Sequence, residues 1–321
     1  MNKILFTIFI TALLLLAYSV IKDQSTIDSP SLSDTSSHEL ADRDHGETPK
    51  SQKIIRNLIG IEFSDKEMLQ ELLDQLANQA LEKNDAYLLS IPLIASAILG
   101  EMDIYGPLQD KISELLTNDA KNEAGYKAWL WGRVLLAGYH INDTVTEDHA
   151  YAHLASLLTS STEDSPFATW GYGYKAIYEA LNKNIDEYNN SLAQGVSIAE
   201  NLALPEKKAD LLWAQVLFLS ATAFADDRHN YDLIFDHMTA SKNEDGEKSN
   251  VDIIQALNGI NEDDWRAWGL ALARFSIART DPKNPIIEPL TDAVIQSAEN
   301  TTSEGNKLLS LLTLAWSQNQ P

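Results

Sequence analysis

The segment SPFATWGYGYK, residues 165–175, decides the fold class of this chain. Ser165 followed by Pro166 is a helix-start signal, because a serine hydroxyl can cap the first turn and proline fits the opening position. Within the segment, the bulky Trp170 is followed directly by Gly171. Such a pair lets a helix fill a gap with one side chain and approach a neighbouring helix closely at the next position. The segment therefore predicts a helix that packs tightly against other helices.

The pairing of tryptophan with a small residue recurs along the chain, with separations of 39, 43, 55 and 48 residues. Each interval leaves room for one partner helix, and the expected partners are residues 149–158, 185–202, 231–239 and 286–299. The pattern predicts a series of antiparallel helix pairs. The five pairs are Trp131-Gly132, Trp170-Gly171, Trp213-Ala214, Trp268-Gly269 and Trp316-Ser317.

Other helix starts are marked by capping residues, prolines and acidic first turns. A capping box at Ser64-Asp65-Lys66-Glu67 precedes apolar residues at helical spacing, and further starts are indicated at 204–206 and 261–264. No stretch shows a convincing alternation of period two or an Asn-Gly hairpin turn. The folded body is predicted to be all-α.

Two helices carry a motif that resembles a known repeat family. Phe167-x2-Trp170-Gly171-x2-Tyr174 and Trp265-x2-Trp268-Gly269-x2-Leu272 resemble the first helix of a tetratricopeptide repeat. Trp131-Gly132-x2-Leu135-x2-Gly138, with the later Asp148-x2-Tyr151-Ala152, is similar to the related Sel1-type repeat.

The resemblance covers residues 120–320, with spacing longer and less even than the family's roughly 34 to 36 residues. The second-helix alanine and the closing proline are not reproduced in register. The resemblance implies an α-solenoid of antiparallel helix hairpins, whose concave surface would hold a partner.

The amino-terminal part of the chain predicts a membrane segment and a tether. Residues 4–21 form an uncharged run of 18 residues, long enough to cross a bilayer as a helix. Residues 1–22 are therefore expected to be a signal-anchor transmembrane helix or a signal peptide, with Ala17-Tyr18-Ser19 as a cleavage site. Residues 23–53 are polar and lack periodicity, which predicts a disordered tether, and residues 54–321 form the predicted helical-repeat domain.

Composition bears on location and partners. The net charge of −23 argues against a nucleic-acid partner. It is best explained by a solvated surface that keeps the protein soluble, and it also suits a basic protein partner. The chain has no cysteine, which excludes thiol catalysis and thiolate metal sites. We expect a bacterial inner-membrane protein of single-pass topology, with its carboxy-terminal domain in the periplasm. The alternative is a soluble periplasmic protein after cleavage.

Two polar clusters were weighed as sites. His149 and His153 lie four residues apart on a predicted helix, where a divalent metal could bridge them. The favoured alternative is a polar face of that helix that binds no metal. The acidic cluster at Asp226 and Asp227 could hold magnesium, but Asn230 stands where a third carboxylate would be expected, and a solvated turn between helices explains the cluster better. Its other members are Arg228, His229, Asp232, Asp236 and His237. Asp263 and Asp264 are accounted for by a helix start. No catalytic, cofactor-binding or metal-binding residue is nominated.

Several aromatic residues could line a sugar-binding groove, although their helical recurrence favours core packing. They are Tyr126, Trp129, Trp131, Tyr172, Tyr174 and Tyr178.

The leading hypothesis is a non-enzymatic, membrane-tethered periplasmic protein that binds a protein or peptide partner for envelope assembly, secretion or chaperone-like scaffolding. The alternatives are a periplasmic immunity or inhibitor protein against a toxin, and a cell-wall or glycan-active α/α enzyme with two carboxylates across a cleft.

Overall fold

The computed structural model describes residues 66–161, 165–202, 207–242, 248–250, 252–260 and 263–318. The chain divides into two compact units, Met1–Leu72 and Leu73–Pro321, and every contact discussed below lies in the second. The predicted membrane segment at 4–21 and the predicted tether at 23–53 fall outside the described residues. Among the helices that are described, none combines the length and apolarity needed to cross a bilayer.

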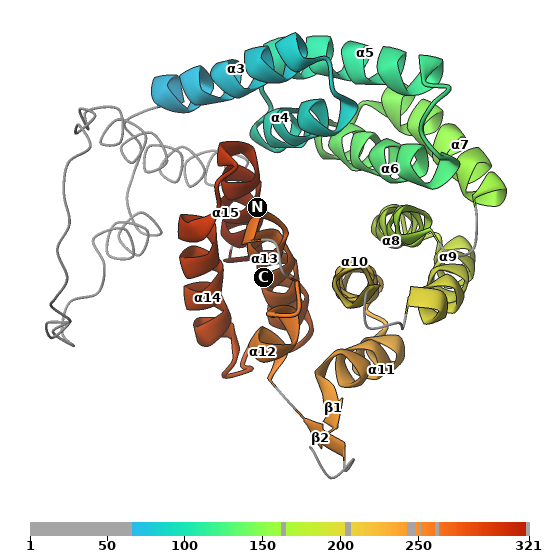
Figure 1. The fold of residues 1–321 in the computed structure, drawn as a ribbon, viewed down its shortest axis with the longest axis vertical. Coiled ribbons are helices and arrows are strands. Elements are labelled where there is room, and N and C mark those ends of the chain that lie inside the picture. The colour runs from blue at the N-terminus through green and yellow to red at the C-terminus, as the bar shows by residue number, and fades with distance from the viewer. Residues whose placement is uncertain are drawn as a thin grey trace, which may run out of the picture. The chain divides into compact units, whose positions relative to one another are not determined.

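The all-α prediction is confirmed, because the described residues are helical apart from connecting turns and one short hairpin (Figure 1). The helices are α3 (Lys66–Lys83), α4 (Ala86–Leu99), α5 (Met102–Asn118), α6 (Ala124–Ile141), α7 (Thr144–Ser160), α8 (Pro166–Leu181), α9 (Ile185–Ala199), α10 (Lys208–Ala225), α11 (Arg228–Thr239), α12 (Ile253–Leu257), α13 (Asp263–Thr280), α14 (Ile287–Asn300) and α15 (Glu304–Gln318). A 3-10 turn, η1 (Glu200–Leu202), follows α9.

Consecutive helices pack as hairpins, and the expected partner helices are confirmed as α7, α9 with η1, α11 and α14. Two of the connecting turns have the same construction. Asn142 and Asp226 adopt left-handed backbone conformations, with φ of 60° and 54°, and end α6 and α10. The next residue is Asp143 after α6 and Asp227 after α10. In each case its carboxylate accepts a hydrogen bond from a backbone N–H in the first turn of the following helix. Because one helix ends and the next begins at adjacent residues, the chain reverses its direction within two residues.

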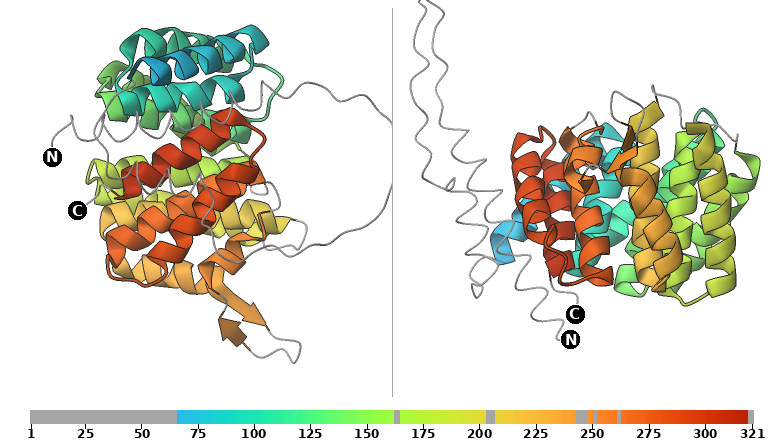
Figure 2. Two further views of the ribbon diagram at one scale, coloured as in Figure 1. Left: turned by 90° about the vertical axis from the view of Figure 1, so that its left-hand side faces the viewer. Right: turned by 90° about the horizontal axis from the view of Figure 1, so that it is seen from below.

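The inner helices of these hairpins form a closed ring. In order, α4, α6, α8, α10, α13 and α15 each contact the next, and α15 contacts α4 (Figures 1 and 2). The closing contact includes a hydrogen bond of 3.2 Å from the Asn306 amide nitrogen to the Tyr87 hydroxyl. Gly305 faces Ile91, where an added Cβ would lie 3.0 Å from the isoleucine Cγ2. The surface expected to be concave and open is therefore the inside of a ring.

A layer of aromatic rings fills the end of the ring where the inner helices begin. Trp129 of α6 lies 5.6 Å from Tyr87 of α4, 5.4 Å from Trp170 of α8 and 5.7 Å from Trp265 of α13, measured between ring centroids. Trp213 of α10 lies 5.4 Å from Trp265. These five side chains, contributed by five inner helices, close that end of the ring. We call them the aromatic plug.

Glycine allows close approach between two inner helices at Gly132, where an added Cβ would lie 2.6 Å from the Cβ of Tyr174. We predict that Gly132→Ala lowers the free energy of unfolding by about 1–3 kcal/mol, because α6 and α8 must move apart. Gly106→Ala is the matched control, since Gly106 lies in α5 and, its chain neighbours aside, no atom lies within 4 Å of an added Cβ. It is expected to change the stability by no more than about 1 kcal/mol, because the gain in helix propensity is opposed by the clash of a Cβ with the ring of Pro107. Urea-induced unfolding measures both, and equal effects would contradict the prediction.

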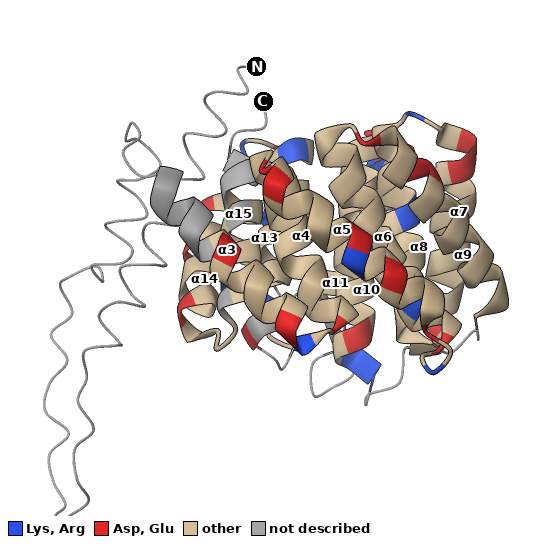
Figure 3. Cartoon of the chain, turned by 90° about the horizontal axis from the view of Figure 1, so that it is seen from above, with Lys and Arg blue, Asp and Glu red and all other residues tan. Residues whose placement is uncertain are grey.

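One feature of the structure was not predicted. Strands β1 (Ala240–Lys242) and β2 (Lys248–Asn250) form an antiparallel hairpin in which Ala240 pairs with Asn250. Strands of three residues are too short for an alternating pattern to show in the sequence. On the side of the molecule drawn in Figure 3, the Lys and Arg positions of the described helices are scattered among acidic and neutral ones.

Candidate functional site

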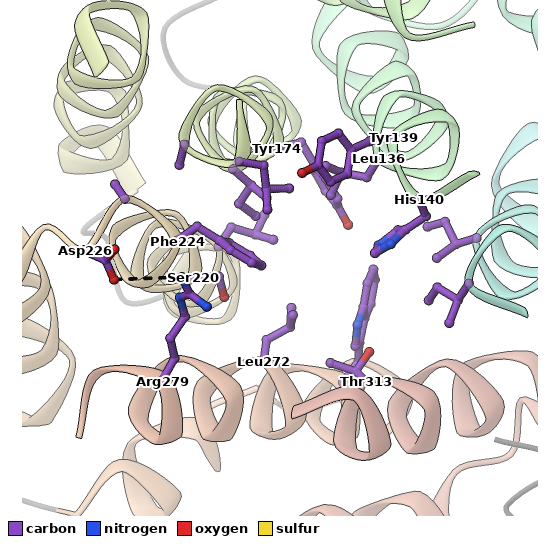
Figure 4. A pocket seen from close by; sticks show the side chains of 18 of the residues that line it. Leu136, Tyr139, His140, Tyr174, Ser220, Phe224, Asp226, Leu272, Arg279 and Thr313 are labelled. Carbon is purple, nitrogen blue, oxygen red and sulfur yellow. Dashed lines mark ion pairs between the residues drawn. The ribbon is translucent and has the colours of Figure 1, made fainter. Parts of the chain in front are cut away.

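The candidate site is a cavity of about 750 Å³ inside the ring, beyond the aromatic plug (Figure 4). All six inner helices contribute to its wall, mostly through their carboxy-terminal halves. The lining residues are Ile94, Ile98, Leu136, Tyr139, His140, Tyr174, Ile177, Ala180, Leu181, Lys183, Ile185, Leu217, Ser220, Phe224, Ala225, Asp226, Trp268, Leu272, Arg279, Leu309 and Thr313.

Helical spacing explains which side chains line the cavity. On α6, Leu136 and His140 lie four residues apart and so share one face of the helix. On α10, Ser220 and Phe224 repeat that spacing. Figure 4 shows these side chains and those of the facing helices directed toward a common central space. Most lining residues are aliphatic or aromatic, which makes the wall predominantly apolar.

Charged groups lie where the inner helices end. Lys183 follows α8 in a left-handed conformation and is exposed. The Arg279 guanidinium approaches the Asp226 carboxylate at 3.9 Å, and its Nε donates a hydrogen bond of 2.7 Å to the carbonyl of Ala223. The Asp226 side chain is 84% exposed, so this pair contributes little to stability. The mouth of the cavity therefore carries two cations and one carboxylate.

His140 also faces the cavity, and the surrounding apolar wall lowers the pKa of its imidazole to about 4. The His140 side chain is exposed to the space of the cavity, so the cause of the lowered pKa is the apolar wall around that space. The direction of the shift means that the imidazole is neutral at pH 7. His140 thus offers a neutral polar group to a ligand.

The lowered pKa of His140 predicts a pH effect on stability. Below the unfolded-state pKa, near 6.5, the unfolded chain gains a proton that the folded chain refuses until pH falls toward 4. Stability conferred by the neutral imidazole is therefore lost as pH falls through this window. We expect His140→Gln to lose less stability than the native chain between pH 7 and pH 5. Parallel urea titrations at the two pH values measure this difference, and identical losses would contradict it.

The floor of the cavity includes Tyr174 and Trp268, which are 2% and 5% exposed. Burial raises the pKa of Tyr174 to about 12, so the phenol is neutral at physiological pH. The indole of Trp129, a hydrogen-bond donor near the Tyr174 hydroxyl, acts against this rise of the pKa. Trp268 packs 5.0 Å from Trp213 of the aromatic plug, measured between ring centroids. The floor is thus continuous with the aromatic plug.

The histidine pair weighed from the sequence lies on the outside of the ring. His149 and His153 of α7 approach each other with 3.1 Å between their Nε2 atoms, and His153 stacks on Trp131 at 4.7 Å between ring centroids. Within the described residues, no group of three or more metal-ligating side chains is present. The pair is accounted for as part of the packing between α6 and α7.

The acidic cluster is divided between two roles. Asp226 reaches the mouth of the cavity. Asp227 caps α11 and accepts hydrogen bonds from the side chain and backbone of Asn230 and, at 3.0 Å, from the Tyr188 hydroxyl. Against the effect of burial, these bonds hold the pKa of Asp227 below the usual range. Arg228 pairs with Asp232 one turn later on the surface of α11. Most of the cluster therefore belongs to a turn between helices, which is the alternative to a magnesium site.

The aromatic residues weighed as a sugar-binding groove lie mainly in the core. Trp129, Trp131, Tyr172 and Tyr174 are at most 8% exposed. Among them, Tyr174 lines the cavity. Sequence reasoning did not single out Lys183, Arg279 or His140. The only signal for them was their place near the carboxy-terminal ends of predicted helices, which becomes informative once the ring brings those ends together.

Known proteins offer no guide to this site. Comparison with protein-family models, curated proteins and solved structures found no match. The geometry of the cavity must carry the functional argument.

Proposed function

We propose that this protein is a ligand-binding protein that holds the apolar part of a small molecule inside its helical ring. The observation that carries the proposal is the cavity of about 750 Å³, closed below by the aromatic plug and lined mainly by apolar side chains. This volume falls in the range of roughly 300–1,000 Å³ typical of small-molecule sites. Burial of an apolar ligand surface supplies the driving force.

The shape of the cavity favours a compact ligand. An extended peptide needs an open groove or a sheet edge along which its backbone can lie. The closing contact between Tyr87 and Asn306 turns the inner surface into a cup instead. The protein or peptide partner expected from the sequence stays a prediction, as does the toxin partner of the immunity hypothesis.

The cavity lends less support to a glycan-cleaving enzyme. That chemistry uses two carboxyl groups on opposite sides of the substrate. Among the residues that line the cavity, Asp226 is the one carboxylate, and it lies at the exposed mouth beside Arg279. Binding therefore accounts for the observed lining better than glycoside hydrolysis does.

The cellular setting of the proposal comes from the sequence. An uncharged run at residues 4–21, followed by a polar stretch at 23–53, favours a domain tethered to the outer face of a bacterial inner membrane. The arrangement in repeated helix hairpins is likewise proposed to derive from a degenerate repeat of the tetratricopeptide or Sel1 type. A tethered cup would take up an amphiphile released at the membrane.

Binding of a neutral apolar dye tests the proposal. We expect N-phenyl-1-naphthylamine to bind the polypeptide that starts at Gln52 in one saturable phase. Leu272→Trp, directed into the cavity, should weaken the affinity at least about tenfold by filling the space. Leu233→Trp is the matched control, because Leu233 is 56% exposed on α11 outside the cavity.

Fluorescence titration distinguishes the outcomes. A dye affinity that responds to Leu272→Trp but not to Leu233→Trp supports binding in the cavity. Equal affinities for all three proteins, or no saturable binding to the native chain, would refute the proposal.

A further inference from the structure

Arg133 is a buried cation without a hydrogen-bond or ion-pair partner among the described residues. Its side chain is completely buried in α6, and none of its three guanidinium nitrogens has a hydrogen-bond partner among the described residues. The ion pairs of the described residues do not include it either. Removing a guanidinium from water without replacing its hydrogen bonds is costly, so such a group calls for an explanation.

Aromatic rings surround this guanidinium. Its central carbon lies 4.8 Å from the ring centroid of Trp268, 5.4 Å from that of Tyr87 and 5.5 Å from that of Trp129. Cation–π attraction offsets part of the cost of burial. The ring faces, however, supply no oxygen that could accept the guanidinium N–H groups. The hydrogen-bonding capacity of Arg133 remains unused.

The neighbouring polar groups without partners are also mainly donors. The indole N–H of Trp213 is buried without a hydrogen-bond partner among the described residues, while the indole of Trp129 lies close enough to the Tyr174 hydroxyl to act on its pKa as a hydrogen-bond donor. Tyr174 is near enough to Arg133 for the positive charge to oppose the rise in its pKa. An indole and a guanidinium can only donate hydrogen bonds. In this part of the core the N–H donors outnumber the acceptors near them, and an oxyanion supplies several acceptors.

Arg133 lies directly beneath the cavity. It precedes Leu136 by three residues and His140 by seven on α6, a spacing that places all three on one face of the helix. Two residues of the cavity floor, Tyr174 and Trp268, lie close to its guanidinium. A ligand that parted these two rings would reach the guanidinium.

We propose that the ligand is an alkyl carboxylate that enters the cavity with its carboxylate first and pairs with Arg133. This inference rests on the proposed function and names the chemical class of its ligand. The planar guanidinium matches a carboxylate with two parallel N–H···O bonds. The Tyr174 hydroxyl would donate a further bond, while the apolar wall between Leu136 and Phe224 would enclose the alkyl chain.

The opposite orientation is the direct competitor. A ligand bound with its carboxylate outward would meet Lys183 and Arg279 at the mouth. Those groups remain in contact with solvent, and Arg279 already bonds the Ala223 carbonyl. A carboxylate there would gain little, since exposed ion pairs are weak. The buried guanidinium without a partner therefore favours the inward orientation.

Octanoate and octan-1-ol are matched probes, because both have an eight-carbon chain and only octanoate is charged. We expect the full chain, in nanodiscs of neutral phosphatidylcholine, to bind octanoate about 10- to 100-fold more tightly than octan-1-ol. Tryptophan fluorescence reports binding, and empty nanodiscs correct for partition into lipid. Arg133→Met removes the charge at similar volume and should abolish the preference for octanoate. Arg133→Lys should keep part of the preference for octanoate, because lysine retains the positive charge but lacks the planar guanidinium that donates two parallel hydrogen bonds.

Lys183→Met is the matched control, since it removes one cation from the mouth. The inference predicts that this variant retains the preference for octanoate. Loss of preference in Lys183→Met with retention in Arg133→Met would overturn the inward orientation. Equal affinities of the native chain for octanoate and octan-1-ol would show that water satisfies Arg133, which overturns the inference but leaves the cavity as an apolar site. Binding of neither probe would count against the proposed function itself.

Discussion

Lys175→Met is expected to lower the free energy of unfolding by about 3–5 kcal/mol. Lys175 and Glu179 form an ion pair one turn apart on α8, with side chains only 9% and 2% exposed. Lys175 also donates a hydrogen bond of 2.9 Å to the Ser191 hydroxyl of α9. The Tyr151 hydroxyl of α7 donates one of 2.8 Å to the Glu179 carboxylate. Loss of the ammonium group would leave a buried carboxylate without a counterion, and urea-induced unfolding of the polypeptide starting at Gln52 measures the cost.

A surface ion pair provides the matched control for this prediction. Lys111 and Glu114 lie three residues apart on α5, with side chains 30% and 58% exposed. Lys111→Met should change the stability by less than about 1 kcal/mol, because exposed pairs contribute little. The double variant Lys175→Met with Glu179→Met should recover most of the lost stability, since apolar replacement of both partners removes the unpaired charge. A single variant as stable as the native chain would disprove the argument.

Trp129→Ala is expected to cost about 3–5 kcal/mol, the usual range for removing a fully buried tryptophan. Trp129 is 2% exposed and touches rings from three other inner helices at the centre of the aromatic plug. Its removal would leave a void where α4, α6, α8 and α13 meet. Since the plug also closes the cavity, we expect the dye affinity of the folded variant to fall as well.

Leu233→Ala serves as the control for the removal of a large side chain. Leu233 is 56% exposed on α11, so its truncation should change stability by no more than about 0.5 kcal/mol. Thermal unfolding followed by circular dichroism compares the two variants. If Trp129→Ala unfolded at the temperature of Leu233→Ala, the plug would have no special role in stability.

Local patterns predicted the helices well. Ser165 caps α8 through a hydrogen bond to the backbone of Ala168, as its position before Pro166 indicated. The tryptophan and glycine pairs marked inner helices because close packing at Gly132 and Gly171 is a requirement that acts within a few residues. Patterns of this kind depend on backbone hydrogen bonds and on the period of 3.6 residues, which neighbouring residues determine by themselves.

The candidate site was not predictable in the same way. Lys183 follows α8, Arg279 lies on α13 and Arg133 lies on α6, and no motif or spacing in the sequence relates them to one another. The cavity to which they relate exists only because six helices surround one axis. Contacts between residues far apart in the chain leave no periodic signal in a single sequence.

The sequence by itself determined that this chain contains helix hairpins, because capping, periodicity and small residues act locally. It also shows that the chain is acidic and that, because cysteine is absent, its chemistry involves no thiol. The tertiary structure decided that the hairpins close into a ring, through contacts such as that between Tyr87 and Asn306, which are 219 residues apart. Closure, and not any single motif, converts helix ends into the mouth of a cavity and places Arg133 beneath its floor.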